Sequence, residues 1–256
     1  MIPLDILTVQ DLSLKYQAEN GEITALDNIS FTVRHGEFMS IVGPSGCGKS
    51  TLLSLIAGLM RPTTGEIVVA GERVDGVSGH IGYMLQKDNL LDWRTIGANV
   101  LFGLEIRRAL TSETRARAER LLKSYDLYEF RDKYPAQLSG GMRQRAALIR
   151  TLATNPDILL LDEAFSALDY QTRLTVTEDV YRILKQEGVT TLMVTHDIPE
   201  SISMGDRVMI LTARPARIRE MLDIRFEGAA RTPLTCRNDP HFGKYFDHIW
   251  KELVAS

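Results

Sequence analysis

The distribution of apolar and polar residues divides the chain into segments of different character. Near the N-terminus, apolar and polar residues alternate over Leu12–Tyr16 and Ile29–Val33, and Ile6–Val9 is a further short run of strand type. Such alternation is typical of strands that are buried on one face. Phe38–Val42 is an apolar run of strand length, and Ser50–Leu59 has the composition of a helix buried on most sides. These segments predict a β-rich start that leads into a buried strand, a loop and a helix.

The stretch from about residue 89 to residue 152 has helical periodicity, with Arg and Glu between Leu and Ala residues, and predicts an inserted helical subdomain. Buried strands and one more helix follow it, at Asp157–Asp162, Leu174–Glu187, Thr190–Thr195 and Arg207–Leu211. Continuous apolar strands of this kind occur in parallel sheets that are covered on both faces. Strands that alternate with helices therefore predict an α/β domain around a parallel sheet.

Composition narrows the class of protein further. A chain of 256 residues is long enough for one α/β domain with an inserted subdomain. Its net charge of -3 gives no global electrostatic reason to bind nucleic acid. The two cysteines, Cys47 and Cys236, have no paired spacing, which fits a reducing cytoplasm. We expect no signal peptide at Met1–Asp5, and the apolar run Leu52–Met60 is shorter than the roughly 20 residues of a membrane span.

A glycine-rich loop lies between the predicted buried strand and helix and fits the pattern G-x-x-x-x-G-K-S. Its residues, with the one that follows, are Gly43, Pro44, Ser45, Gly46, Cys47, Gly48, Lys49, Ser50 and Thr51. Glycines let the backbone N–H groups point at phosphate oxygens, and the helix N-terminus adds partial positive charge. Lys49 is expected to reach the β- and γ-phosphates, and the Ser50 hydroxyl to hold Mg²⁺. The loop alone leaves kinases, GTPases and ATPases open.

Two further features bear on this loop. The strand that ends at Asp162 is followed by Glu163. Asp162 is expected to meet Mg²⁺, and Glu163 to polarise an attacking water as a general base. Cys47 is interpreted as a residue whose backbone matters more than its thiol. Its positive surroundings predict a thiol that reacts with alkylating reagents unless ATP is bound.

The segment Leu138–Arg145, with the sequence LSGGMRQR, resembles the LSGGQ signature of ABC ATPases, with Met142 where many members have Gln. Ser139 can cap a helix, while Gly140 and Gly141 leave backbone N–H groups open to an anion. The resemblance implies that the signature of one copy closes over ATP held by another. It therefore implies a homodimer with two ATP molecules between the subunits.

Other motifs of this family occur in the expected order. The resemblance assigns Gln86 to the loop that senses Mg²⁺ and the membrane partner, Asp169 to the dimer interface, and His196 to the γ-phosphate. It also assigns Tyr16 to stacking on adenine. The alternative is that Tyr16 only covers the edge of the small sheet. Catalysis would rest on Glu163, His196, Gln86 and Lys49, and Mg²⁺ on Ser50, Gln86 and Asp162.

The implied fold is a phosphate-loop parallel-sheet core with an N-terminal antiparallel β subdomain and an inserted helical subdomain. We expect this ATPase domain over residues 1–215 and a C-terminal extension over residues 216–256. In the extension, Asp239 and Pro240 are expected to start an amphipathic helix that packs on its own domain. Segments Asn89–Thr95 and Phe165–Arg173 resemble the ATPases of nitrate, sulfonate and taurine importers.

That resemblance implies two integral-membrane permease subunits, an extracytoplasmic substrate-binding protein, no nucleic acid, and a peripheral place on the cytoplasmic face of the bacterial membrane. A membrane helix would dock near Asn89–Arg94, with Trp93 as an anchor. Two alternatives remain open. One is a soluble ABC-type ATPase that is not coupled to transport. The other is a phosphate-loop metabolic kinase, which would not need Leu138–Arg145 or Asp169.

Overall fold

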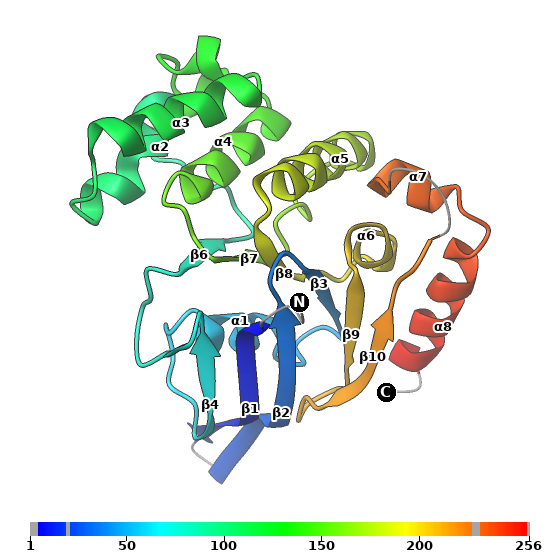
Figure 1. The fold of residues 1–256 in the computed structure, drawn as a ribbon. Coiled ribbons are helices and arrows are strands. Elements are labelled where there is room, and N and C mark those ends of the chain that lie inside the picture. The colour runs from blue at the N-terminus through cyan, green and yellow to red at the C-terminus, as the bar shows by residue number, and fades with distance from the viewer. Residues whose placement is uncertain (1–4, 19–20, 227–230, 255–256) are drawn as a thin grey trace.

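A computed structural model describes residues 5–18, 21–226 and 231–254, which form two β-sheets, with most of the helices above and to the right of them in the view of Figure 1. The strands of the first sheet are β1 (Asp5–Ala18), β2 (Gly21–Arg34), β4 (Thr64–Val69) and β5 (Glu72–Arg73). The strands of the second are β3 (Phe38–Val42), β6 (Ile81–Met84), β7 (Ile158–Asp162), β8 (Thr190–Val194), β9 (Arg207–Leu211) and β10 (Ile218–Asp223). The helices are α1 (Lys49–Ile56), α2 (Ile96–Ile106), α3 (Ser112–Ser124), α4 (Gly140–Leu152), α5 (Tyr170–Glu187), α6 (Ile198–Met204), α7 (Pro233–Arg237) and α8 (Phe242–Val254).

The six-stranded sheet has the order β10-β9-β3-β8-β7-β6, and all its pairings are parallel except that of β10 with β9. The first sheet is antiparallel, with the order β2-β1-β4-β5. The predicted fold class is therefore confirmed. The two short strands expected at 6–9 and 12–16 are one strand, β1, whose pairing shifts register between Val9 and Leu12. Asp11 lies at that irregularity with φ of 47°, which is a β-bulge conformation.

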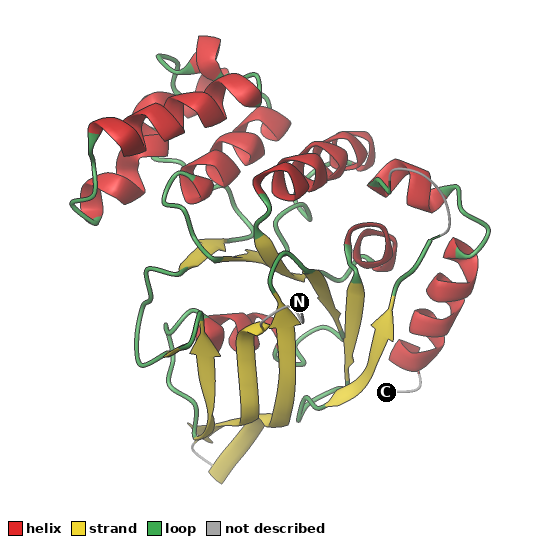
Figure 2. Ribbon diagram, viewed as in Figure 1, coloured by secondary structure: helices red, strands yellow, loops and turns green. Residues whose placement is uncertain are grey.

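The central strands are buried on both faces because each face meets a different hydrophobic core. In β7, Ile158 and Leu160 belong to the core shared with α1 and the antiparallel sheet. Leu159 and Leu161 belong to the core shared with α4 and α5. Successive side chains of a strand point to opposite faces, so one apolar run can serve both cores. Figure 2 shows the helices and the small sheet on either side of the central strands.

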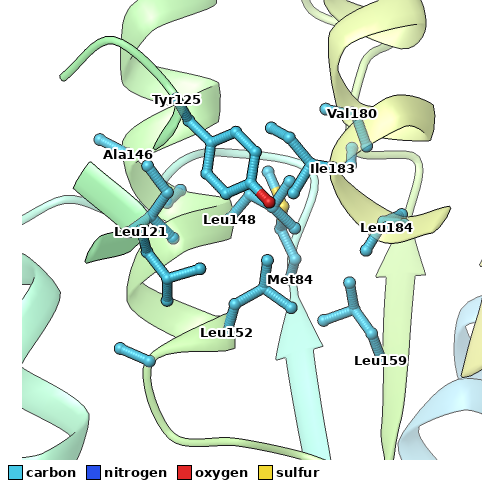
Figure 3. Close-up of a cluster of buried hydrophobic side chains, with 14 of the residues drawn as sticks. Met84, Leu121, Tyr125, Ala146, Leu148, Leu152, Leu159, Val180, Ile183 and Leu184 are labelled. Carbon is cyan, nitrogen blue, oxygen red and sulfur yellow. The ribbon is translucent and has the colours of Figure 1, made fainter. Parts of the chain in front are cut away.

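The predicted helical insertion is present as α2, α3 and α4. It is joined to the six-stranded sheet by a shared core, in which Met84 of β6 and Leu159 of β7 lie opposite Leu148 and Leu152 of α4 (Figure 3). Tyr125, at the end of α3, lies in the same cluster and its hydroxyl donates a 2.8 Å hydrogen bond to Glu187 of α5. The insertion and the sheet are therefore packed against each other through α4.

The C-terminal extension packs on its own domain, as expected. Ile249 of α8 is fully buried in a cluster with residues of α6 and β9. Regular helix begins at Phe242 rather than Pro240, although Asp239 accepts a 2.7 Å hydrogen bond from the His241 N–H. The expected boundary at 215/216 falls just before β10, so the extension begins with an edge strand of the central sheet. Within the described ranges, no helix is long and apolar enough to cross a membrane.

Candidate functional site

The phosphate-loop sequence curls around the ammonium group of Lys49. The loop connects β3 to α1, and Gly48 at the helix start has φ of 120°, a conformation that favours glycine. A side chain at Gly43 would come within 2.9 Å of Cys47 Sγ. Lys49 is buried, and its Nζ donates hydrogen bonds to the carbonyl oxygens of Gly43 at 2.8 Å and Pro44 at 3.0 Å. The loop thus encloses a fixed positive charge.

Ser50 and Asp162 meet at the ends of α1 and β7. The Ser50 hydroxyl donates a 2.8 Å hydrogen bond to Asp162 Oδ1. The Tyr83 hydroxyl, from β6, donates to the other carboxylate oxygen at 3.1 Å, and burial raises the pKa of Tyr83 well above its usual value. The sequence prediction did not include Tyr83, because nothing in an apolar strand marks one hydroxyl as a partner. Together these contacts fix the orientation of the Asp162 carboxylate.

Glu163 and His196 form the second pair of the site. His196 follows β8, and its Nδ1 lies 3.1 Å from Glu163 Oε2. Glu163 has φ of 48°, a left-handed conformation that costs about 1 kcal/mol or more in a residue other than glycine. Its backbone N–H donates to the carbonyl oxygen of Val194 on the neighbouring strand. The strained turn directs the Glu163 carboxylate away from the sheet and toward His196.

Gln86 joins this group through Ser166. The Gln86 amide donates a 3.1 Å hydrogen bond to Ser166 Oγ, and Ser166 Oγ donates to the Glu163 carbonyl oxygen at 2.9 Å. The segment after β6 is therefore tied to the loop that carries Glu163. The Gln86 side chain points to this loop, whereas Ser50 and Asp162 bond to each other, so the three expected Mg²⁺ ligands are not gathered around one point.

The signature segment and Asp169 lie together in a surface cavity of about 550 Å³ between the starts of α4 and α5. Ser139 caps α4 by accepting a 3.3 Å hydrogen bond from the Met142 N–H. Asp169 caps α5 in the same way through the Thr172 N–H at 3.1 Å, and hydrogen bonds with Thr172 lower the pKa of Asp169. Among the described residues, the cavity lining includes none from the phosphate loop.

The structure corrects the expectation for Cys47. Its side chain is 1% exposed, and burial raises the pKa of its thiol more strongly than Lys49 and Arg214 lower it. The thiol is therefore neither accessible nor activated. Arg214, which the sequence prediction did not place at the site, donates a 3.1 Å hydrogen bond to the Gly46 carbonyl oxygen. A residue 168 positions away carries no local signal of this contact.

Tyr16 lies on the antiparallel sheet, where it pairs with Ile23. Its hydroxyl is 3.9 Å from Met60 Sδ, and 37% of the residue is exposed. Tyr16 is therefore partly open to solvent, and its hydroxyl is turned toward Met60, in the segment after α1.

The side chains also fit a hard divalent cation. Ser50 and Asp162 place two oxygen donors next to each other beside the phosphate loop. Oxygen donors, few of them from the protein and the rest from phosphate and water, are the usual set for Mg²⁺ in such sites. No group of three or more His, Cys, Asp or Glu residues that could hold a metal occurs in the described part of the chain.

The fold and the site define a phosphate-loop domain that binds and hydrolyses nucleotide. The family described as "ABC transporter" matches residues 26–166. The chain belongs to this family and is an ATPase of the ABC type.

Similar proteins cover almost the whole chain. It is 46% identical to "Uncharacterized ABC transporter ATP-binding protein YtlC" of Bacillus subtilis, over 98% of this chain and 96% of the relative. It is 40% identical to "Nitrate import ATP-binding protein NrtD" of Synechocystis sp., over 95% and 93%. It is 35% identical to "Taurine import ATP-binding protein TauB" of Jannaschia sp., over 95% and 92%.

The chain also superposes on a solved structure, "Dimeric structure of a post-hydrolysis state of the ATP-binding cassette MJ0796 bound to ADP and Pi", with a TM-score of 0.71 at 32% sequence identity. The match covers 86% of this chain and all of that one. The likeness therefore extends over most of this chain.

Proposed function

We propose that this chain energises an importer of a small nutrient of the nitrate, sulfonate or taurine kind, from the cytoplasmic face of a bacterial membrane. Two copies would act with two integral-membrane permease subunits and an extracytoplasmic substrate-binding protein. The similarity to nitrate and taurine import proteins over nearly the whole chain supports this choice of substrate class. One observation supports the ATPase site most directly. The Ser50–Asp162 pair and the Glu163–His196 pair lie at the ends of the neighbouring strands β7 and β8.

The phosphate loop would hold ATP through its backbone N–H groups and through Lys49. The Lys49 ammonium now bonds to loop carbonyl oxygens, and it would exchange these neutral acceptors for the stronger, charged oxygens of the β- and γ-phosphates. Ser50 and Asp162 would hold Mg²⁺, which supplies positive charge to the phosphates when bound. The exposed ring of Tyr16 would stack on adenine.

Glu163 is the proposed general base. Its carboxylate projects from a strained turn directly after the metal-binding position, so it can accept a proton from a water placed in line with the γ-phosphate. His196 contacts the same carboxylate, and it would hold the γ-phosphate and the water in register. Gln86, tied to this turn through Ser166, would report the state of the site to the helical insertion.

The signature cavity supports a site shared between two copies. Ser139, Gly140 and Gly141 line it at the N-terminus of α4, where backbone N–H groups and the helix dipole favour an anion. The phosphate loop does not contribute to its lining among the described residues. The γ-phosphate that these residues would bind therefore comes from ATP on a second copy, and Asp169 would lie in the same interface.

A groove of about 360 Å³ between α2 and α3 supports docking of a permease helix. Its lining begins at Thr95 and includes apolar residues such as Leu101 and Leu122. It also includes the charged residues Glu105, Arg115, Glu119, Arg131 and Asp132. The expected site at Asn89–Arg94 is adjacent in sequence rather than part of the lining. Trp93 is 76% exposed, which fits an aromatic anchor at the entrance of such a groove.

The direct test is Glu163→Gln. The variant should bind ATP with unchanged affinity, lose hydrolysis by about a hundredfold or more, and form a dimer that size-exclusion chromatography detects at high ATP. Glu129→Gln, which removes one exposed negative charge from the helical insertion, is the matched control and should behave like the wild type. Normal hydrolysis by Glu163→Gln would remove this residue from the mechanism.

Co-purification from membranes tests the transport role separately. If integral-membrane subunits co-purify with the wild type and do not co-purify with Trp93→Ala, the result supports the importer. An active ATPase that never associates with membrane subunits would support the alternative, a soluble ABC-type ATPase.

A further inference from the structure

Arg173, on the first turn of α5, connects two loops of the site that are far apart in the sequence. One Nη atom donates to the carbonyl oxygen of Leu168 at 2.8 Å and to that of Ser166 at 3.4 Å. The other Nη atom donates to Asp197 Oδ2 at 3.2 Å. The first loop leads to the interface residue Asp169, and the second contains His196.

Further hydrogen bonds hold Asp197 in this contact. Its Oδ1 accepts a 2.9 Å hydrogen bond from the Glu200 N–H and caps α6, while its Oδ2 accepts from Arg173. Its own N–H donates to Thr195 Oγ1 at 3.0 Å. Both carboxylate oxygens and the backbone are therefore engaged. Because Asp197 follows His196 directly, the guanidinium of Arg173 helps to set where the imidazole stands relative to Glu163.

The guanidinium is suited to this task. It is planar and always charged, and its fork can bond to carbonyl oxygens and a carboxylate at once, which an ammonium group cannot do with the same geometry. Its side chain is 22% exposed and that of Asp197 is 23% exposed, so water competes only partly for the contact. Charge-assisted hydrogen bonds in such partly buried places are stronger than those on an open surface.

We infer that Arg173 is a positioning residue. When the second copy of the chain docks at residues 166–169, Arg173 transmits this contact through Asp197 to His196, the residue assigned to the γ-phosphate. A partner that shifts this loop moves the carbonyl oxygens of Ser166 and Leu168, and the guanidinium carries that displacement to Asp197. Each site would then become competent only when the opposite copy is in place. The inference rests on the hydrolytic site proposed above.

The test compares steady-state ATPase activity, over a range of ATP concentrations, of the wild type, Arg173→Met, Arg173→Lys, Asp197→Asn and the double variant. Asn at 197 keeps one oxygen that can cap α6, but an NH2 group, which cannot accept a hydrogen bond from Arg173, replaces the second carboxylate oxygen. Arg182→Met is the matched control, because Arg182 lies on the same helix, its side chain is 64% exposed, and it pairs with Asp179 one turn away.

Arg173→Met and Asp197→Asn should each lower kcat about tenfold, with half-saturating ATP changed by less than about twofold. The dependence on ATP should lose its cooperativity, since coupling between the two sites is broken. The double variant Arg173→Met/Asp197→Asn should be no slower than either single variant, because each single substitution already removes the Arg173–Asp197 hydrogen bond. Arg173→Lys should recover part of kcat, and Arg182→Met should match the wild type.

Wild-type kcat and cooperativity in Arg173→Met and Asp197→Asn would overturn the inference, as would losses that multiply in the double variant. If Arg173→Met does not fold, as judged by circular dichroism, Asp197→Asn and Arg173→Lys still decide the question. Glu163→Gln, assayed in parallel, distinguishes failure of the proposed hydrolytic site from failure of the Arg173–Asp197 inference. Full activity of Glu163→Gln would refute the hydrolytic site. An inactive Glu163→Gln together with wild-type behaviour of Arg173→Met would refute only the role of the Arg173–Asp197 contact.

Discussion

The Ser50 hydroxyl donates a 2.8 Å hydrogen bond to Asp162 Oδ1, although the two residues are 112 positions apart. This contact joins the helix after the phosphate loop to the end of the strand that carries the acidic pair. It brings together two of the three residues that the sequence assigned to Mg²⁺, and it depends on the parallel placement of β3, β8 and β7.

Asp162→Asn tests the metal role of this pair. Asn keeps the shape and can still accept from Ser50, but it removes the negative charge that holds a divalent cation. We expect hydrolysis to fall by about a hundredfold and the Mg²⁺ requirement to rise, with metal-free ATP binding retained. ATPase assays over a Mg²⁺ titration, with ATP binding measured in EDTA, decide this. Tyr83→Phe removes the second hydrogen bond to Asp162 without changing any charge and is the control. An unchanged Mg²⁺ requirement in Asp162→Asn would contradict the assignment.

Contiguous motifs were predictable from sequence because their geometry is local. Phe38–Val42 forms a strand with the expected bounds, and the loop after it has the curled backbone that its glycines allow. Ser139 caps its helix as the serine–glycine sequence suggested. Each of these features depends on neighbours within a few residues, so a short stretch of sequence contains most of the information.

Contacts between distant elements were not predictable. Arg173 meets Asp197 only because α5 and α6 pack on the same face of the sheet, and Arg214 meets Gly46 only because the chain returns along β9. The Cys47 prediction failed for a related reason. Nearby charges can be read from sequence, whereas the burial that outweighs them depends on the whole fold.

Cys47 should resist alkylation in the folded protein. Burial both shields the sulfur and raises the pKa of the thiol, so less thiolate is present near neutral pH than in a free cysteine. Iodoacetamide should modify Cys47 at less than about a tenth of the rate found in denaturing urea. Mass spectrometry of the tryptic peptides gives the rate for each cysteine, with Cys236, also buried, as an internal comparison. Rapid native alkylation that ATP suppresses would restore the expectation drawn from sequence.

The two glycines of the signature should respond differently to alanine. A Cβ at Gly141 would lie 2.9 Å from Val176 Cγ2 of α5, whereas a Cβ at Gly140 meets nothing closer than Leu168 at 3.5 Å. Gly141→Ala should lower the free energy of unfolding by about 1–2 kcal/mol through this clash. Gly140→Ala should change it by less than about 0.5 kcal/mol. Urea unfolding measures both values.

Val176→Ala provides the control for this comparison. It removes the methyl group that the new Cβ would meet, so it should cost less stability in the Gly141→Ala background than in the wild type. Equal destabilisation at 140 and 141 would mean that α4 and α5 do not approach each other as closely as these distances require.

Glu200, on α6, should make the stability of the protein depend on pH near neutrality. The residue is 4% exposed, its Oε1 has no hydrogen-bond partner among the described residues, and burial raises the pKa of its carboxyl to about 7. A raised pKa in the folded state means that folding favours the protonated form. This contribution is complete below the unfolded pKa of about 4.5, and it is lost as the pH rises through the folded value.

Glu200→Gln removes this dependence, since Gln keeps the shape and never ionises. The difference in free energy of unfolding between the variant and the wild type should therefore grow in favour of the variant by about 2 kcal/mol between mildly acidic and mildly alkaline pH. Urea unfolding of both proteins at several pH values across this range measures it, and all other titrating groups cancel in the difference. A difference that stays constant with pH would mean that the Glu200 carboxylate is already ionised at the acidic end and has a partner or solvent access that its burial does not suggest.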